Sequence, residues 1–211
     1  MKNKISNISL IWFFIFSFAV FSGYCQAESI DQRLFDQIHT RWQRDWLDGP
    51  MQFCTDAGDT KVGIAICAGV GLFGSKKASQ SAKLALTADG ASAVITYGLK
   101  SIVNRDRPEG PTERSNSSFP SGHATGAFAL ATVFSHQYPK LSIPLYMAAT
   151  GVAVSRIYLG RHYPSDVLAG AVVGFATAKL TIHFKKQILG FEFDTFLHDI
   201  FSKDENPDPS P

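Results

Sequence analysis

Three short segments in the second half of the chain contain side chains that could bind an anion and transfer a proton. The segments read KSIVNRDRP, PSGH and SRIYLGRHYPSD. Their polar and glycine residues of interest are Lys100, Arg107, Ser121, Gly122, His123, Arg156, His162 and Asp166. Fixed cations and N–H dipoles can compensate the charge that spreads over the three oxygens of a phosphoryl group in transfer. Two histidines on opposite sides of such a group could then supply the in-line roles.

Each of these residues also has an ordinary structural role. A lysine or arginine at the end of a helix commonly complements the helix dipole. Ser121 is a typical N-cap, and Asp166 would cap a helix that begins at Val167. A single histidine is more often structural than catalytic. The hypothesis of a site therefore depends on the three segments meeting at one end of the fold.

The elements that would bring the segments together are apolar stretches rich in alanine and glycine. They run from Val62 to Phe73, Leu84 to Val103, Ala124 to Phe134, Ile143 to Val154 and Val167 to Phe184. No alternating strand pattern of any length appears, so the predicted fold is an all-α bundle of about five core helices. An up-and-down bundle would place the three segments at the same end. Gly170 and Gly174, four residues apart, are typical of close helix packing.

A further amphipathic helix is predicted from Ile30 to Phe53. Its apolar residues recur near helical spacing with charges between them: Ile30, Leu34, Phe35, Ile38, Trp42 and Trp46. Two roles remain open for this helix. It could pack on the domain, or it could lie at a membrane interface with its tryptophans as anchors.

The 211 residues read as one domain with additional segments at both ends. Residues 1–27 have the pattern of a signal peptide or an N-terminal membrane anchor, because Lys2 and Lys4 precede an apolar run. Residues 28–190 would form the helical domain. Residues 191–211 would form a C-terminal segment whose polar, proline-rich tail is disordered. A net charge of +2 argues against a nucleic-acid-binding surface, and the three cysteines show no metal-ligand pattern.

Two patterns bear on whether the bundle spans a membrane. Most of the apolar stretches are shorter than the roughly 18 to 20 residues that a span needs. The lysines, however, fall at alternate ends of the successive helices, as in a positive-inside topology with a cytoplasmic N-terminus. We therefore expect a transmembrane bundle in a bacterial inner membrane with the three segments facing the periplasm. A soluble periplasmic bundle is the alternative.

In order and spacing, the three segments resemble the signature of the type 2 phosphatidic acid phosphatase family. This family includes bacterial class A acid phosphatases and vanadium haloperoxidases. Six residues separate Lys100 from Arg107, PSGH follows, and five residues separate Arg156 from His162. The resemblance covers residues 100–166 without a departure at any signature position. It implies an all-helical fold and hydrolysis of a phosphoester or phosphoanhydride through a phosphohistidine, with neither a metal nor another cofactor.

The resemblance also implies a role for each matching residue. His162 would be the nucleophile, and Asp166 would hold its other ring nitrogen. His123 would protonate the leaving oxygen and then take a proton from the water that cleaves the phosphohistidine. The groups that bind the phosphoryl oxygens would be Lys100, Arg107, Ser121, Gly122 and Arg156.

A membrane location favours a lipid phosphate or diphosphate as the substrate, such as phosphatidic acid, phosphatidylglycerol phosphate, undecaprenyl diphosphate or a lipid A phosphate. The sequence does not choose among them, and it leaves the oligomeric state open. One alternative is a soluble, non-specific acid phosphatase acting on small phosphomonoesters. A more remote alternative is a vanadium haloperoxidase. The loop arginines Arg105, Arg114 and Arg161 are either solvated charges or contacts for a second phosphate.

Overall fold

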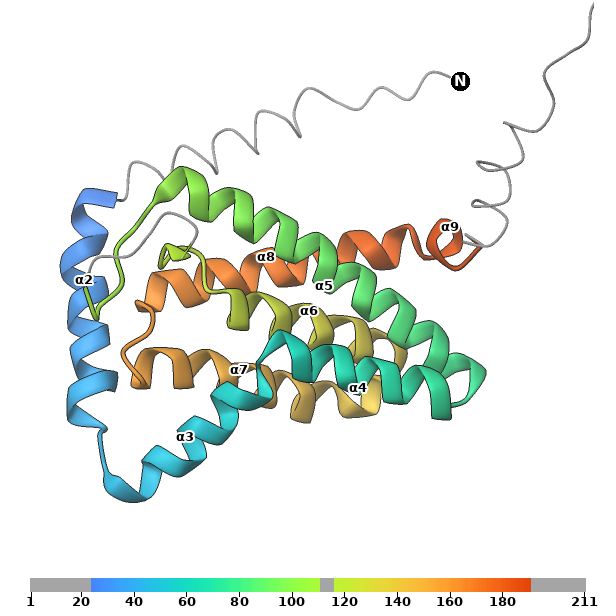
Figure 1. Cartoon of the computed structure of the whole chain (residues 1–211), viewed down its shortest axis with the longest axis horizontal. Helices are drawn as coiled ribbons and strands as arrows, with labels where there is room; N and C mark the ends of the chain where they lie inside the picture. The colour runs from blue at the N-terminus through green and yellow to red at the C-terminus, as the bar shows by residue number, and fades with distance from the viewer. Residues whose placement is uncertain (1–23, 111–115, 191–211) are drawn as a thin grey trace, which may run out of the picture.

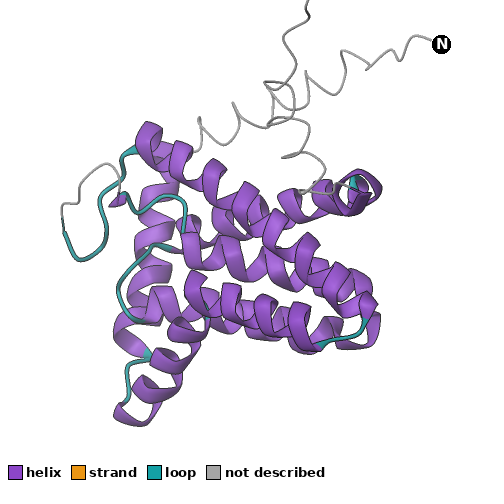
Figure 2. Ribbon diagram, turned by 45° about the vertical axis from the view of Figure 1, so that its right-hand side comes forward, coloured by secondary structure: helices purple, strands orange, loops and turns teal. Residues whose placement is uncertain are grey.

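The computed structural model describes residues 24–110 and 116–190, and within these ranges the chain forms helices and loops with no β-strand. The predicted all-α class is therefore confirmed. Figure 2 shows helices throughout, joined by loops that are short except for the one between α5 and α6. Most of the predicted segments 1–27 and 191–211 lie outside the described residues, and residues 24–27 belong to the first described helix.

The five apolar stretches all appear as helices, each longer than the stretch that predicted it. The elements are α2 (Tyr24–Asp36), η1 (Gln37–Arg41), α3 (Asp45–Ala57), α4 (Thr60–Phe73), α5 (Lys76–Val103), α6 (Gly122–Gln137), η3 (Pro139–Leu141), α7 (Ser142–Tyr158), α8 (Pro164–His183) and α9 (Lys185–Gly190). Helix α6 packs against α5, α7 and α8. Figure 1 shows α2 lying across the end of the bundle at which α6 and α8 begin and α7 ends.

Local sequence accounts for several helix ends. The Asp59 carboxylate accepts a hydrogen bond from Lys61 N at 2.8 Å and so caps the start of α4. Ser75 Oγ accepts one from Ala78 N at 3.4 Å at the start of α5. Asn104 ends α5 in the left-handed conformation, with φ 46°, which asparagine tolerates better than most residues. These ends determine where the loops between the core helices begin.

The helix predicted from Ile30 to Phe53 is divided in two. Helix α2 and the π-helical turn η1 end at Arg41, and α3 begins at Asp45. Between them Arg44 is extended, with φ −152° and ψ 136°. Its N–H donates a hydrogen bond to the Tyr158 hydroxyl at 3.2 Å. The prediction of one continuous helix is wrong at residues 42–44, because this contact with the end of α7 holds the chain out of the helical conformation.

The two helices of this region both contact the bundle, but they differ in how far their aromatic side chains are exposed. Phe35 of α2 is buried and packs in a cluster with Ala124, Ile157 and Val167. Helix α2 is therefore held against the bundle. Trp46 and Phe53 of α3 are both 74% exposed. These aromatic side chains remain available for another apolar phase.

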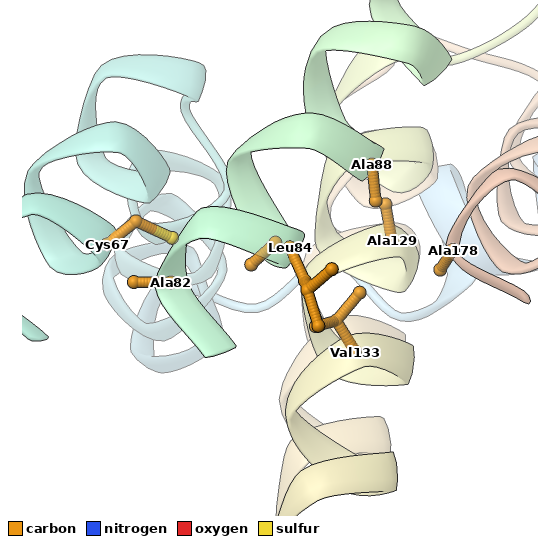
Figure 3. Close-up of a cluster of buried hydrophobic side chains, with 8 residues drawn as sticks. Cys67, Ala82, Leu84, Ala88, Ala129, Val133 and Ala178 are labelled. Carbon is orange, nitrogen blue, oxygen red and sulfur yellow. The ribbon is translucent and has the colours of Figure 1, made fainter. Parts of the chain in front are cut away.

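The core is built from small side chains. Figure 3 shows Leu84 and Ala88 of α5 lying against Val133 and Ala129 of α6, and the cluster extends to Ala178 of α8. Each of these five residues is fully buried. Because alanine adds little width, the helix backbones can approach closely. The close packing holds the ends of α5, α6 and α8 in fixed positions.

Gly170 and Gly174 of α8 make the close approach that their spacing predicted. A Cβ atom on Gly170 would lie 2.5 Å from Ser121 O, and one on Gly174 would lie 2.1 Å from Thr125 O. Both neighbouring atoms belong to the backbone of α6 or its N-cap. No side chain fits at either position unless the two helices separate.

We expect Gly174→Ala to destabilise the protein by about 1 to 3 kcal/mol, because the new methyl group would force α8 away from α6. The measurement is the free energy of unfolding in detergent. The matched control is Gly90→Ala in the middle of α5, where an added Cβ meets no atom within 4 Å. That change should be neutral or stabilising, since alanine is the better helix former. Equal stability of the two variants would contradict the packing of α8 on α6.

The outer faces of the core helices are apolar. Among the described helices, α8 is the one that is long and apolar enough to cross a membrane by itself. Large apolar side chains are nevertheless exposed on four core helices, including Phe73 (90%), Val94 (74%), Ile143 (75%) and Leu168 (67%). Soluble monomers rarely expose apolar patches of this extent. The outer surface is suited to contact with lipid or with another apolar surface.

Candidate active site

The three sequence segments meet where α5 and α7 end and α6 and α8 begin. Ser121 N, in front of α6, donates a hydrogen bond to Asp166 O in the first turn of α8 at 2.9 Å. Ser118 N donates to Arg105 O in the loop after α5 at 2.7 Å. The backbone itself therefore ties the segments together at the end of the bundle covered by α2 (Figure 1).

His162 is placed by the turn between α7 and α8. Gly160, just after the end of α7, adopts φ +74°, a left-handed conformation that favours glycine. This residue turns the chain away from the axis of α7. His162 N then donates to Arg156 O at 3.2 Å. The imidazole is 2% exposed. Its Nδ1 lies 2.8 Å from Ser118 O.

The contact with Ser118 fixes the tautomer of His162. A carbonyl oxygen can only accept, so Nδ1 must carry the hydrogen and donate it. In the neutral ring, Nε2 then has the free lone pair that a nucleophile needs. The resemblance placed Asp166 directly on this ring nitrogen. In the structure Asp166 Oδ2 lies 3.9 Å from Nδ1, too far for a hydrogen bond, and the Ser118 carbonyl takes its place.

Asp166 is fully buried and accepts hydrogen bonds from three groups. Ser118 Oγ donates to it at 2.5 Å, Tyr163 N at 2.9 Å and Arg105 Nη1 at 2.7 Å. Ser118 Oγ also lies 3.5 Å from His162 Nδ1. Ser118 therefore connects the carboxylate to the imidazole, through both its hydroxyl and its carbonyl.

Arg105 links this centre to the N-terminal helix. Its Nη2 forms an ion pair with Asp31 of α2 at 2.6 Å, and its Nη1 forms one with Asp166 at 2.7 Å. Its guanidinium also lies over the ring of Tyr163, 4.1 Å from the centroid. Asp31 further accepts from Ser165 N and from Ser165 Oγ. Arg105 is thus neither a solvated loop charge nor a free contact for a second phosphate, the two roles that the sequence suggested.

Arg156 is 9% exposed and has a single described hydrogen bond from its guanidinium. Its Nη1 donates to Thr55 Oγ1 of α3 at 2.6 Å, so α3 orients the side chain. Its Nε is buried and has no partner among the described residues. Ser121 Oγ is buried and likewise without a partner there. Ser121 is the N-cap residue of α6 by position, but its hydroxyl makes no capping bond.

The other cations have partners that hold them near the same place. Lys100 Nζ donates to Ser117 O. Arg107 donates to Asn116 twice, from Nε to the carbonyl at 3.2 Å and from Nη2 to Oδ1 at 2.6 Å. Arg161 forms an exposed ion pair with Glu109 at 2.8 Å, and Arg114 lies outside the described residues. The loop therefore directs Arg107 through Asn116, and no carboxylate among the described residues forms an ion pair with Arg107.

A cavity of about 280 Å³ opens beside Arg107 and Arg156. Its lining residues are Gln52, Thr55, Asp56, Asp59, Arg107, His123, Arg156, Leu159 and Arg161. It therefore combines His123 with two of the three predicted phosphate-binding cations. Gly122 is exposed at the start of α6, and a Cβ there would meet no atom within 4 Å. The first turn of α6 is consequently open to an approaching anion.

The surroundings of His162 favour its neutral form. Burial and the nearby cations Arg156, Arg107 and Lys100 hold the pKa of His162 well below its ordinary value. A neutral imidazole is the form that can attack phosphorus. The cations that would bind a phosphate thus also keep the His162 imidazole unprotonated.

We expect His162 to remain neutral at pH values well below about 6.5, the ordinary pKa of histidine. The measurement is an NMR titration of ring-labelled histidine in the full-length protein, with the resonance assigned by its loss in His162→Asn. Because the folded pKa lies below the unfolded one, the unfolded chain binds more protons between the two values. The contribution of His162 to stability is therefore lost as the pH falls below about 6.5. A ring that titrates at or above 6.5 would contradict the described electrostatics.

Sequence reasoning missed three residues of this centre, Asp31, Thr55 and Ser118, and it did not foresee the role of Arg105. Ser118 stands two residues before PSGH, and Arg105 lies inside the first segment, so both were close to a recognised signal. Asp31 and Thr55 lie on helices far away in the sequence. The pattern around them predicts an amphipathic helix, and nothing in that pattern distinguishes these two polar residues from the others.

Known proteins that resemble this chain share the region that holds the site. The family model of the PAP2 superfamily matches residues 82–189. A lipid A 1-phosphatase of Porphyromonas gingivalis is 37% identical over 116 residues, which are 51% of this chain and 25% of that protein. The undecaprenyl-diphosphatase BcrC of Bacillus subtilis is 28% identical over 170 residues, which are 77% of this chain and 88% of that protein. The chain thus spans about a quarter of the length of the first relative.

Two solved structures have the same fold. LpxE of Aquifex aeolicus superimposes with a TM-score of 0.64 at 26% identity, over 72% of this chain and 94% of that one. A transmembrane PAP2-type phosphatidylglycerolphosphate phosphatase of Bacillus subtilis superimposes with a TM-score of 0.67 at 24% identity, over 88% of this chain and 98% of that one. The family match covers half of the chain and contains all eight candidate site residues of the three segments. This chain belongs to the PAP2 superfamily.

Proposed function

We propose that this protein is a phosphatase that hydrolyses a lipid phosphate or diphosphate through a phosphohistidine intermediate, without a metal ion. One observation carries the proposal. Two of the groups expected to bind phosphate, Arg156 Nε and Ser121 Oγ, are buried without a partner in the described part of the chain. Buried donors are nearly always satisfied in folded proteins, and Arg156 lines the cavity, so its unsatisfied Nε points to an anionic ligand.

The first step is attack by His162. Its Nε2 lone pair forms a bond to phosphorus while the bond from phosphorus to the leaving oxygen breaks. His123, which lines the cavity, gives a proton to that oxygen. Water then forms a bond to phosphorus while the bond from phosphorus to His162 Nε2 breaks, and the water gives a proton to His123. Inorganic phosphate leaves, which restores both histidines.

The charge on the phosphoryl group would be met by fixed groups of the protein. Arg107 and Arg156 line the cavity, and Lys100 is close enough to affect the ionisation of His162. The open first turn of α6 adds N–H dipoles at Gly122. Such groups cost little reorganisation during the reaction, which is why preorganised charge is effective in catalysis.

Ser118, Asp166 and Arg105 would act through His162. Ser118 O accepts the hydrogen bond from the Nδ1–H group of His162, so the lone pair of Nε2 stays free to attack. Asp166 stabilises the positive charge that develops on the imidazole when the bond to phosphorus forms. Arg105 fixes the carboxylate in place from the other side. Arg105 is thus a positioning residue.

A lipid substrate is supported by the outer surface and by the relatives. The exposed apolar residues on α4, α5, α7 and α8 would contact acyl chains, while the cavity lies at one end of the bundle, where a headgroup would be found. The relatives include phosphatases named for lipid A and for undecaprenyl diphosphate. The alternating lysines support a location of this end on the periplasmic side of the inner membrane.

The test is a phosphate-release panel with the full chain in detergent. Phosphatidic acid, phosphatidylglycerol phosphate, undecaprenyl diphosphate and lipid A phosphate are compared with p-nitrophenyl phosphate and glucose 6-phosphate. We expect at least one lipid to be hydrolysed about tenfold or more faster, in kcat/KM, than either soluble ester, and the activity to survive a chelator. Preference for the soluble esters, together with extraction of the protein without detergent, would instead establish a soluble acid phosphatase.

The effect of vanadate distinguishes the proposed phosphatase from the remaining alternative, a vanadium haloperoxidase. It mimics the transition state of phosphoryl transfer and should inhibit the proposed enzyme. Activation by vanadate in the presence of peroxide and halide would show a haloperoxidase and overturn the proposal.

A further inference from the structure

A second cavity of about 420 Å³ lies next to the phosphate cavity. Its lining residues are His39, Gln43, Asp48, Gly49, Gln52, Tyr158 and Leu159. Gln52 and Leu159 line both cavities, so the two meet along this wall. The volume of this cavity falls within the range found for small-molecule binding sites. Tyr158 and Leu159 belong to the third sequence segment, and the other five lining residues lie outside the three segments.

His39 presents a hydrogen-bond acceptor to this cavity. Its Nδ1 lies 2.7 Å from Tyr158 O, and because a carbonyl can only accept, Nδ1 must be the donor. The ring stacks on Phe35, with the centroids 4.9 Å apart, and a Cβ on Gly160 would lie 3.1 Å from its Cε1. The imidazole is therefore held in one orientation. In the neutral ring, its Nε2 can only accept.

Asp48 and Gln52 also supply acceptors. The Tyr158 hydroxyl donates to Asp48 Oδ1 at 2.5 Å, which leaves Oδ2 of the same carboxylate. Gln52 Nε2 donates one of its two hydrogens to Asp56 Oδ1 at 2.8 Å, which fixes the orientation of the amide and leaves Oε1 as an acceptor and the second N–H as a donor. No lysine or arginine is among the residues that line this cavity.

The carboxylate of Asp48 and the absence of a lysine or arginine from the lining make this cavity unfavourable for a second phosphate, because its negative oxygens would meet a negative group. The chemistry fits a group that carries several O–H donors and no negative charge. We propose that the second cavity is a subsite for a hydroxyl-rich group, such as a sugar ring, attached next to the phosphate that is cleaved. This inference rests on the proposed function and narrows its substrate to glycolipid phosphates.

The two sides of α3 agree with this arrangement. Asp48, Gln52 and Thr55 lie on the side that faces the two cavities. Trp46 and Phe53 lie on another side of the helix, on average roughly 140° around its axis from these residues, and both are 74% exposed. Helix α3 would thus separate the polar headgroup from acyl chains, with aromatic side chains at the boundary where they are commonly enriched.

The experiment compares two lipid phosphates that differ in the group next to the phosphate. Phosphatidic acid carries no hydroxyl there, whereas an acylated glucosamine 1-phosphate carries several. We expect the wild-type protein to favour the glucosamine lipid by about tenfold or more in kcat/KM, because a site that offers acceptors rejects a ligand without donors. Equal rates, or a preference for phosphatidic acid, would overturn the inference.

The variant is Asp48→Asn. Asparagine can still accept the Tyr158 hydroxyl through Oδ1, but it replaces the remaining acceptor by an N–H₂ donor. We expect it to lower kcat/KM for the glucosamine lipid about tenfold and to leave phosphatidic acid within about twofold. An equal loss on both lipids, or no loss on either, would contradict the subsite.

The matched control is Asp45→Asn, one turn earlier in α3. Asp45 also lies in the first turn of α3, so this change removes the same charge from the same helix terminus, but Asp45 lines neither cavity. We expect both lipids to be hydrolysed at wild-type rates within about twofold. An effect equal to that of Asp48→Asn would show that the charge of the helix terminus, and not a subsite, sets the preference. A wild-type protein that hydrolyses neither lipid nor any other member of the panel would instead refute the proposed function itself.

Discussion

Replacing His162 by alanine should reduce phosphate release by at least about 10⁴-fold, because the side chain supplies the nucleophile and no neighbouring group can replace it. The effect should appear in kcat for every substrate that the enzyme accepts. The measurement is phosphate release under single-turnover conditions in detergent. A general loss of structure must be excluded, since His162 is 2% exposed and donates to Ser118 O.

The variant His162→Asn separates folding from chemistry. An asparagine side chain can place an N–H near the position of Nδ1 and keep the bond to Ser118, but it has no nucleophilic nitrogen. We expect it to melt close to the wild type and to be as inactive as the alanine variant. The control His136→Ala, in the last turn of α6 and exposed, should keep full activity. Activity above about 1% of wild type in a folded His162→Asn would exclude covalent catalysis by this residue.

Arg156→Lys should lower kcat/KM by about 10²- to 10³-fold, the usual effect of removing one donor that stabilises the transition state. The charge is kept, but lysine cannot bind Thr55 with one nitrogen and offer a second to a phosphoryl oxygen. Because Arg156 is 9% exposed, water cannot readily take over the missing bond. Steady-state kinetics on the best lipid of the panel measure the effect.

The control for this substitution is Arg41→Lys, an exposed arginine in η1. Its rate should stay within about twofold of the wild type, since lysine and arginine are exchangeable where neither is bound in a fixed geometry. A loss below about threefold in Arg156→Lys would mean that only the positive charge matters. The two-pronged recognition of phosphate inferred from the buried, unpartnered Nε would then be wrong.

The bundle was predictable because each core helix has a local signal. Apolar runs marked all five core helices, and the spacing of Gly170 and Gly174 indicated the contact that these residues make with α6. The end of the bundle that carries the site was predictable too, since the order of the segments fixes which helix ends meet in an up-and-down arrangement. These features depend on residues that are close in sequence.

The links that orient the site were not predictable in the same way. Arg105 pairs with Asp31, which lies 74 residues earlier, and Arg156 binds Thr55, which lies 101 residues earlier. The break before α3 depends on a contact of Arg44 with Tyr158, 114 residues later. The partner of His162 Nδ1 is a backbone carbonyl, which every residue possesses. Tertiary contacts decide such features, and no pattern of residue types encodes them locally.

The most direct test of the central claim is to trap the phosphoenzyme. The full-length protein is mixed with a lipid labelled in its phosphoryl group, quenched within milliseconds into alkaline detergent, and mapped by peptide mass spectrometry. The account predicts label on the peptide that contains His162, attached to Nε2 because Nδ1 is held by Ser118 O, and lost on acid treatment. Turnover without any labelled protein, or label on Nδ1 or on another residue, would contradict it.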